Sequence, residues 1–545
     1  MADGMDGAAG FTLVSGADAA AAEPESRRGP PQRDKVLAAV MVAKWAFWRD
    51  GDGAAYATIP GVDGCGPQRH AVRSKRFALL VRALYGAANS RVIGDRKVPG
   101  SISDSAMAEV LPSLEAMALG GRVRTPAVRS CHDSGGAVWL DLGTEDWSVV
   151  RVGPDGWRVL EGLDCALVRP GALRALPIPV HADARATLDE LRRLLNLDPA
   201  RANDLRLIVG WLVAALYPSG PYPVLALDGE QGSGKSTTCR FLRRLVDPNK
   251  ADLRAPPRSE DDLIVAAQAC RIVALDNVSA INDETADALC RLATGAGLSK
   301  RTLYTDDDEY LASVCRPVLL NGIPSVLARG DLADRSLAIT LPPIPDALRR
   351  TEAELHRQFE AAAPAILGLL LDAVALVLRD GPGLHLPGLP RMADFARLAC
   401  AAAPAFGWTA GEMLAALRDN RTAAVEAVIE GDPVAVAARE LAQAGWSGTA
   451  SELLETLSRR VSEAQQRERG YPKDGARLSA RLRRLAPALR RDGVDLVLPT
   501  TGGRHGRIIV IGMARNEQEA IERSERCQRS QRSGPAPDEA GGGEI

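Results

Sequence analysis

The chain has 545 residues, a formal net charge of -2 at pH 7 and nine cysteines. Its length is more than one hydrophobic core supports, so roughly three or four domains are expected. The near-neutral charge excludes a uniformly basic protein of the histone type, but it is compatible with a local basic surface. The odd number of cysteines and the lack of a Cys-x-x-Cys pair fit a disulfide framework poorly. We expect a cytoplasmic protein without membrane association, because neither a secretory leader nor an uninterrupted apolar stretch of about twenty residues is present.

The two ends of the chain, residues 1–33 and 514–545, are predicted to be disordered tails because they contain few large apolar side chains. Residues 34–180 are predicted to form a separate α+β domain, with an apolar helix over residues 35–48 and a strand meander over residues 137–160. This segment lacks the clustered carboxylates that a two-metal primase site needs. Its role is left open.

Three further segments are predicted from the spacing of apolar residues. Residues 181–220 should form a helical collar, residues 221–345 an α/β core of alternating strands and helices, and residues 346–430 a helical lid. Residues 431–513 end in helices followed by two strands, which is typical of a winged-helix-like domain. The expected fold class is therefore α/β, with an N-terminal α+β domain, a lid and a C-terminal winged-helix-like domain.

A glycine-rich loop lies where the first core strand, residues 223–228, turns into a helix. This context is typical of a phosphate-binding loop. Gly232 and Gly234 would let backbone N–H groups close on phosphate oxygens, while Lys235 would neutralise the β- and γ-phosphates. Ser236 would bind Mg²⁺. The residues predicted to bind the nucleotide are Gly229, Gly232, Ser233, Gly234, Lys235, Ser236 and Thr237. We therefore expect ATP and Mg²⁺ as cofactors, with hydrolysis of the ATP.

Polar side chains also stand at the ends of later core strands. Asp276 is predicted to be the second Mg²⁺ ligand, because the carboxyl ends of parallel strands meet beside the phosphates. Asn277 follows where many such ATPases place a second acid, and an amide can orient water but cannot take its proton. The identity of a general base is therefore open. Asn321 could position the attacking water, although a turn-forming role before Gly322 is the alternative.

Arg335 stands just before the fourth strand, residues 336–341, and could reach the nucleotide of a neighbouring subunit. A solvated surface arginine is the alternative. The four motifs in this order resemble the superfamily 3 helicase branch of the AAA+ ATPases, in particular the ATPase domain of phage and prophage primase-helicase proteins. The resemblance implies a P-loop AAA+ core, with Asp276 as the metal-ligating acid and Asn321 as the sensor amide. Arg335 then looks like a trans-acting arginine finger, with Arg329 in reserve.

The same resemblance implies an oligomeric ring, a homo-hexamer, with single-stranded DNA in its pore. Residues 298–310 would form the hairpin that faces this DNA, with Lys300 and Arg301 on its phosphates. Four acids at residues 306–309 follow directly and would repel DNA, unless they lie on the far limb or form subunit contacts.

A run of arginines near the C-terminus, with no acid between them, indicates a separate DNA-binding surface. Its members are Arg477, Arg481, Arg483, Arg484, Arg490 and Arg491. Placed before two strands, the run predicts duplex DNA contacts at Arg481, Arg483 and Arg484. A partner-binding or merely solvated helix is the alternative.

Three functions fit these features. The first is an ATP-driven DNA helicase or translocase that acts as a ring in phage or mobile-element replication, with DNA and other replication proteins as partners. The second is an ATP-switched initiator or loader that assembles on DNA without unwinding it, which Asn277 and the acids at 306–309 favour. The third, a small-molecule kinase, would need neither the Asn321 and Arg335 arrangement nor the basic C-terminal segment.

Overall fold

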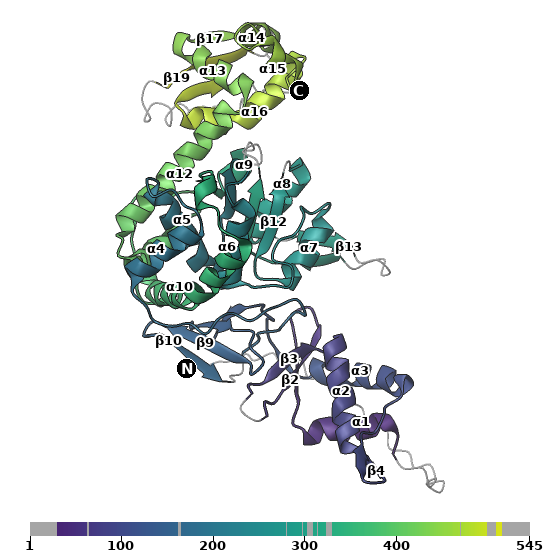
Figure 1. Cartoon of the computed structure of the whole chain (residues 1–545). Coiled ribbons are helices and arrows are strands. Elements are labelled where there is room, and N and C mark those ends of the chain that lie inside the picture. The colour runs from purple at the N-terminus through teal and green to yellow at the C-terminus, as the bar shows by residue number, and fades with distance from the viewer. Residues whose placement is uncertain are drawn as a thin grey trace, which may run out of the picture.

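The computed structural model describes residues 30–514, apart from residues 63–64, 162–164, 279–280, 297, 302–308, 313, 323–329, 469 and 499–507. The predicted tails lie almost wholly outside the described residues. The N-terminal tail was predicted to end at residue 33, but the first helix, α1, already begins at Gln32. The fold is mixed α/β with several sheets, as expected. Figure 1 shows an N-terminal lobe, a central body and, at the far end of helix α12, a C-terminal lobe.

The N-terminal lobe has its own hydrophobic core between a four-stranded sheet and three helices. The sheet order is β3-β2-β1-β6, and a small hairpin, β4-β5, projects from the lobe. The elements are α1 (Gln32–Val42), β1 (Ala46–Arg49), β2 (Ala55–Ile59), β3 (Gln68–Ala71), α2 (Lys75–Ala88), β4 (Arg91–Ile93), β5 (Arg96–Val98), α3 (Asp104–Leu119) and β6 (Arg122–Val123).

The helix predicted over residues 35–48 is wrong in its last part. Helix α1 ends at Val42, and Lys44 takes a left-handed φ of 54°. Trp48 lies instead in strand β1, where its ring stacks on Tyr56 of β2 at 4.5 Å between centroids. A short apolar run suits either a helix or a strand, and here the cross-strand stacking partner decides.

The strand meander packs mainly on the central body, although Trp147 also contacts His70 of the N-terminal lobe at 5.8 Å between ring centroids. Its strands are β7 (Ser130–His132), β8 (Val138–Asp141), β9 (Ser148–Gly153) and β10 (Gly156–Glu161). The inner face of β8 and β9 belongs to the central hydrophobic core. Trp157 also donates a hydrogen bond of 2.8 Å to Asp372 in the central body. Residues 34–180 therefore do not form one separate domain, because strand alternation reveals a buried face but not the element that covers it.

A fully buried arginine fixes the meander to the central body. Arg129 donates hydrogen bonds to the carbonyl oxygens of Asp141 at 2.9 Å and Pro248 at 3.2 Å. Its guanidinium also forms an ion pair of 3.4 Å with Asp247, which is equally buried. A buried charge of this kind is tolerated only when it is paired and hydrogen-bonded, so these contacts make the interface specific.

The central body is built on a parallel sheet of four strands in the order β12-β15-β11-β16. These are β11 (Val224–Gly229), β12 (Val273–Val278), β15 (Val318–Gly322) and β16 (Ser336–Leu341). Alternate residues of β11 face different cores, with Leu225 and Leu227 on the side of α6 (Lys235–Val246). Val224 and Ala226 face α7 (Glu260–Ala269) and α8 (Asp283–Thr294). Both faces are covered, which explains the continuous apolar runs in the sequence.

The helices that precede and follow the sheet segment along the chain pack into the same core. They are α4 (Ala184–Leu194), α5 (Ala202–Leu216), α10 (Glu352–Asp380), α11 (Ala393–Ala402) and α12 (Ala410–Glu430), with short 3-10 turns η2 (Asp346–Leu348), η3 (Gly381–Gly383) and η4 (Ala403–Phe406). The predicted collar, core and lid therefore share one hydrophobic core.

Within the described residues, α10 is the one helix long and apolar enough to cross a membrane by length and composition. Its apolar window is 61% buried inside the protein, and the helix packs on α4, α5 and α11. Asp372 interrupts the apolar run and accepts the Trp157 hydrogen bond. These contacts are those of a core helix.

The C-terminal lobe has a core of its own, to which Ala333 and Val428 of the central body also contribute. Its elements are α13 (Pro433–Ala444), β17 (Trp446–Thr449), α14 (Ala450–Ser458), α15 (Glu463–Arg467), α16 (Gly475–Arg491), β18 (Val494–Val497) and β19 (Ile508–Met513). The three strands form an antiparallel sheet in the order β17-β19-β18. The two C-terminal strands were expected, whereas β17, four residues between two helices, was not.

Candidate functional site

The glycine-rich loop connects β11 to α6, as the sequence predicted, and three of its glycines adopt conformations that other residues rarely take. Gly229, Gly232 and Gly234 have φ values of 144°, 85° and 82°, and Gly234 is the N-cap of α6. A Cβ on Gly229 would lie 2.5 Å from the carbonyl oxygen of Leu341. Glycine is therefore required here both by backbone conformation and by the close approach of β16.

Lys235 lies at the first residue of α6 and folds back over the loop. Its Nζ donates hydrogen bonds to the carbonyl oxygens of Gly229 at 2.6 Å and Glu230 at 2.8 Å. The ammonium group is thus held at the loop, beside the N-terminus of α6, where the helix dipole and free N–H groups favour an anion.

Three predicted polar side chains meet at the carboxyl ends of the parallel strands. Ser236 Oγ donates to Asp276 Oδ1 at 2.9 Å, and Asn321 Nδ2 donates to the same oxygen at 2.8 Å. Asn321 is buried, and its Oδ1 accepts the backbone N–H of Asn277 at 2.6 Å. Asn321 therefore fixes both the carboxylate and the backbone that carries it. Beneath them, burial raises the pKa of the Cys239 thiol, which keeps it neutral.

Asn277 takes a left-handed φ of 53° where the pairing of β12 with β15 shifts register. Asn adopts this conformation more readily than most residues with a side chain. Its side chain is exposed. A backbone requirement thus accounts for an amide at this position.

The donor set at Ser236 and Asp276 fits Mg²⁺. This ion is usually held by one or two carboxylate or hydroxyl oxygens together with substrate phosphates and water. In the part of the chain that the structure describes, no three His, Cys, Asp or Glu side chains gather into a cluster that could hold a metal alone. Phosphate oxygens would have to complete the coordination of a metal here.

Two residues that the sequence did not single out hold the loop in place. Asn196, at a left-handed φ of 52°, donates from Nδ2 to the carbonyl oxygens of Ser233 at 3.1 Å and Pro342 at 2.8 Å. Thr238 Oγ1 donates to the carbonyl oxygen of Leu195 at 3.1 Å. An Asn directly after an apolar helix is a recognisable helix-end signal, but its contact with the loop is not visible in the sequence.

Arg335 follows the short helix α9 (Gly330–Ala333) at the start of β16. Its side chain is half-buried and forms an ion pair with Asp331, and its Nη1 donates to the Asp331 carbonyl oxygen at 3.3 Å. Its described contacts include none with Lys235 or Asp276, so it does not join the polar cluster at the glycine-rich loop of its own chain. Arg329 lies outside the described residues.

The hairpin expected over residues 298–310 is found as β13 (Leu298–Arg301) and β14 (Glu309–Ala312), which pair antiparallel. Arg301 lies opposite Glu309 and Lys300 opposite Tyr310. The acids at 306–308 lie outside the described residues, as do the side chains of Lys300 and Arg301. A DNA contact at this hairpin stays a prediction.

The arginines of helix α16 divide into two groups. Arg481 donates from Nε to Asp432 at 2.9 Å, and Arg490 donates to the Leu496 carbonyl oxygen at 3.1 Å, so both stabilise the lobe itself. Arg483 and Arg484 are exposed and form no ion pair with the described residues. These two remain available for an external anion, whereas Arg481 has a structural partner.

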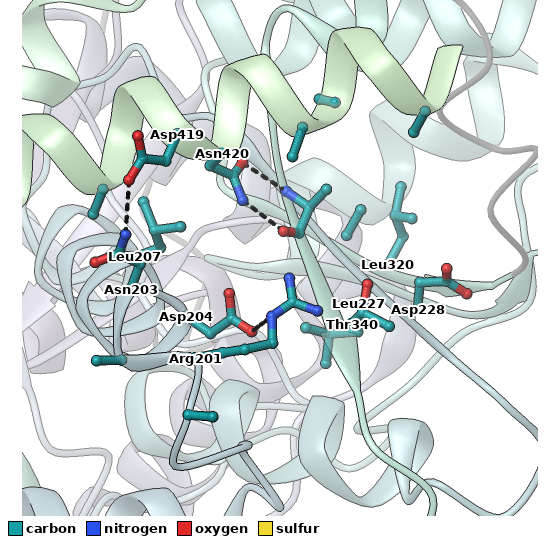
Figure 2. Close-up of a pocket in the computed structure, with 18 of the residues that line it drawn as sticks. Arg201, Asn203, Asp204, Leu207, Leu227, Asp228, Leu320, Thr340, Asp419 and Asn420 are labelled. Carbon is teal, nitrogen blue, oxygen red and sulfur yellow. Dashed lines mark hydrogen bonds and ion pairs between the residues drawn. The ribbon is translucent and has the colours of Figure 1, made fainter. Parts of the chain in front are cut away.

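A cavity of about 450 Å³ lies between the sheet, the start of α5 and helix α12 (Figure 2). Asn420 of α12 holds the edge strand β16 there through both the N–H and the carbonyl of Ala338, at 3.1 and 2.6 Å. Buried Asp204 forms an ion pair of 3.1 Å with Arg201. Burial raises the pKa of Asp204 to about 6.

Two family models match the chain. One, described as "Actinomycete integrative conjugative element replication protein", matches residues 188–423, and the other, "AICE RepA C-terminal domain", matches residues 434–527. Together they span more than half of the chain, and they meet at the end of α12, where the C-terminal lobe begins. The chain belongs to this family of replication proteins of actinomycete integrative conjugative elements. The expected association with mobile-element DNA replication is thereby confirmed at the level of this RepA family.

Similar solved structures are three apo forms of the "NrS-1 C terminal region". The first has a TM-score of 0.38 and 11% identity, and the match covers 88% of this chain and 99% of that one. The other two have TM-scores of 0.35 and 0.36 at 13% and 12% identity. Scores this low establish no shared activity. A comparison of this RepA family member with curated proteins gave no significant match.

Proposed function

We propose that the chain is an ATPase that acts as an oligomeric ring, a DNA helicase or translocase, in the replication of its mobile element. The observation that carries the proposal is the meeting of Ser236, Asp276 and Asn321 beside Lys235 and the glycine-rich loop. The family match supports a replication role. The order of strands also supports a P-loop core of the AAA+ type, because it places the Asn321 strand between the loop strand and the acid strand.

The residues have distinct roles in this proposal. Ser236 and Asp276 would hold Mg²⁺, which when bound would neutralise charge on the phosphate oxygens. Lys235 leaves the loop carbonyls and pairs with the phosphates, since a charged acceptor forms the stronger hydrogen bond. Asn321 keeps the carboxylate of Asp276 in place and presents an amide beside it. The amide of Asn277 cannot accept a proton from the attacking water, so the general base is unassigned.

The DNA contacts proposed are of two kinds. Arg483 and Arg484 on α16 would bind duplex phosphates, because they are exposed and unpaired within the described residues. Single-stranded DNA would pass the β13-β14 hairpin with its Lys300 and Arg301, in the centre of a homo-hexamer. Both kinds of contact are independent of base sequence.

A second candidate is an ATP-switched initiator or loader that assembles on DNA without unwinding it. The observation in its favour is Asn277, since no second acid follows Asp276. A strand-displacement assay on forked DNA separates the two candidates, because only a helicase releases the strand.

The test of the ATPase ring uses two variants that should fail for different reasons. Lys235→Ala should lose ATP binding or turnover, because the phosphates lose their counter-charge. Arg335→Ala should bind ATP but hydrolyse it poorly, since trans-acting arginine fingers contribute roughly 10³ to 10⁵ in rate. Mixing the two should restore part of the activity, because some interfaces then join an intact loop to an intact finger.

Unchanged turnover in Lys235→Ala would contradict the ATPase assignment. If mixed oligomers form but stay inactive, Arg335 does not act between subunits, and the ring loses its mechanistic support. Native mass spectrometry of the mixture shows whether mixed oligomers are present.

A further inference from the structure

A buried carboxylate connects the segment that carries Arg335 to the C-terminal lobe. The side chain of Asp334 is only 5% exposed and forms ion pairs with three arginines. Arg491 of α16 donates to the carboxylate from both terminal guanidinium nitrogens, Nη1 and Nη2, and Nη2 lies 2.6 Å from Oδ2. The guanidinium nitrogens of Arg391 and Arg421 lie 3.2 and 3.7 Å from the carboxylate oxygens. Burial acts to raise the pKa of Asp334, but Arg491, Arg421 and Arg391 together hold it below its ordinary value.

A second carboxylate extends this connection to Arg335 itself. Asp331 forms an ion pair with Arg335 and another, of 3.2 Å, with Arg391. Arg391 therefore lies between the two carboxylates. The ion pairs run without a break from Arg335 through Asp331, Arg391 and Asp334 to Arg491.

Apolar packing follows the same path. Leu332 of α9 lies in the core of the parallel sheet, whereas its neighbour Ala333 lies in the core of the C-terminal lobe. The backbone carbonyl of Arg335 accepts the N–H of Val224 at 2.9 Å, at the start of the strand that leads to the glycine-rich loop. A movement of the lobe must therefore alter the surroundings of Arg335.

The position of Arg491 on α16 makes this connection sensitive to DNA. Arg484 and Arg491 are seven residues apart, about two helical turns, so they lie on the same face of the helix. Arg484 is exposed, whereas Arg491 points to the central body and is 34% exposed. A phosphate is a bidentate acceptor for arginine just as a carboxylate is. DNA phosphates that follow this face past Arg484 therefore compete with Asp334 for Arg491.

We propose that Asp334 and Arg491 form a latch that duplex DNA opens, and that the closed latch holds Arg335 on Asp331, away from a neighbouring subunit. The proposal rests on the proposed function and adds a regulation to it. Asp334 and Asp331 are positioning residues for Arg335. DNA bound to α16 takes Arg491 from Asp334, the segment with Arg335 is released, and ATP hydrolysis rises.

The test measures DNA affinity first, because binding and latch opening must be reciprocal. Asp334→Asn should bind a short duplex of random sequence several-fold more tightly than the parent, with a salt slope steeper by up to about one unit, since one arginine is freed for phosphate. Asp334→Glu keeps the charge and should restore parental binding. The matched control is Glu463→Gln, which removes an exposed acid on α15 from its pair with Arg467.

ATP turnover is the second measurement. Asp334→Asn should hydrolyse ATP faster than the parent without DNA and gain little on its addition, whereas Glu463→Gln should match the parent. The latch is overturned if the parent turns over ATP but Asp334→Asn binds duplex DNA no more tightly than Glu463→Gln does. A parent without ATP turnover overturns the proposed ATPase instead, and the binding measurements alone then decide the latch. A general loss of fold in Asp334→Asn would weaken DNA binding, which is opposite to the expected change.

Discussion

The buried carboxylate of Asp204 gives a prediction that does not depend on any function. Its side chain lines the cavity of Figure 2, and burial raises its pKa from 3.8 to about 6, against the opposing attraction of Arg201. In the unfolded chain the same group titrates near its ordinary value. Folding therefore favours the protonated form of this group.

The sign and size of the effect follow from that difference. Below about pH 4 the carboxyl is neutral in both states and contributes nothing. As the pH rises from about 4 to 6 the unfolded chain loses its proton first, so the free energy of unfolding falls. Above the folded pKa of about 6 the loss is complete. At 1.36 kcal/mol per pKa unit it amounts to about 2 to 3 kcal/mol.

Replacing Asp204 with Asn removes the titration and keeps the shape of the side chain. We expect Asp204→Asn to be more stable than the parent by about 2 kcal/mol above pH 7, with an advantage that shrinks toward pH 4. Urea unfolding followed by tryptophan fluorescence over this pH range measures the difference. The control is Asp189→Asn, an exposed carboxyl on α4. A stability difference between Asp204→Asn and the parent that is the same at every pH would refute the reasoning.

Two further predictions concern the sites described above. Arg129→Ala should lower the free energy of unfolding by about 3 to 5 kcal/mol, because buried Asp247 loses the nearer of its two ion-pair partners, Arg129 at 3.4 Å and Arg243 at 3.9 Å, and two buried carbonyl oxygens lose their hydrogen-bond donor. Equilibrium unfolding beside exposed Arg174→Ala checks this, and equal stability of the two variants would contradict it. Asn277→Gly should unfold at the parental denaturant concentration, whereas Asn277→Ala should lose roughly 1 kcal/mol because Ala resists a left-handed φ. Parental stability in Asn277→Ala would show that this backbone conformation is not strained.

The sequence by itself determined the parts of the protein that rest on local patterns. The glycine-rich loop stands between strand and helix as predicted, because its glycines are required by the local backbone and by β16. The polar residues Asp276 and Asn321 meet because parallel strands share one carboxyl edge, which follows from strand type alone. The helices and the last two strands of the C-terminal lobe were likewise visible from helical spacing and turn residues, apart from the short strand β17.

Tertiary structure decided which faces meet. Alternation along β8 and β9 marked a buried side, but only the fold shows that α10 and its neighbours cover it. The meander therefore belongs to the core of the central body and not to the expected N-terminal domain. Asp334 and Arg491 are 157 residues apart, and nothing in the sequence predicts that they pair with each other. Asn196 likewise carries no sign of the loop it holds. Contacts between distant residues depend on how whole elements pack, and apolar periodicity records that a side chain is buried without recording its partner.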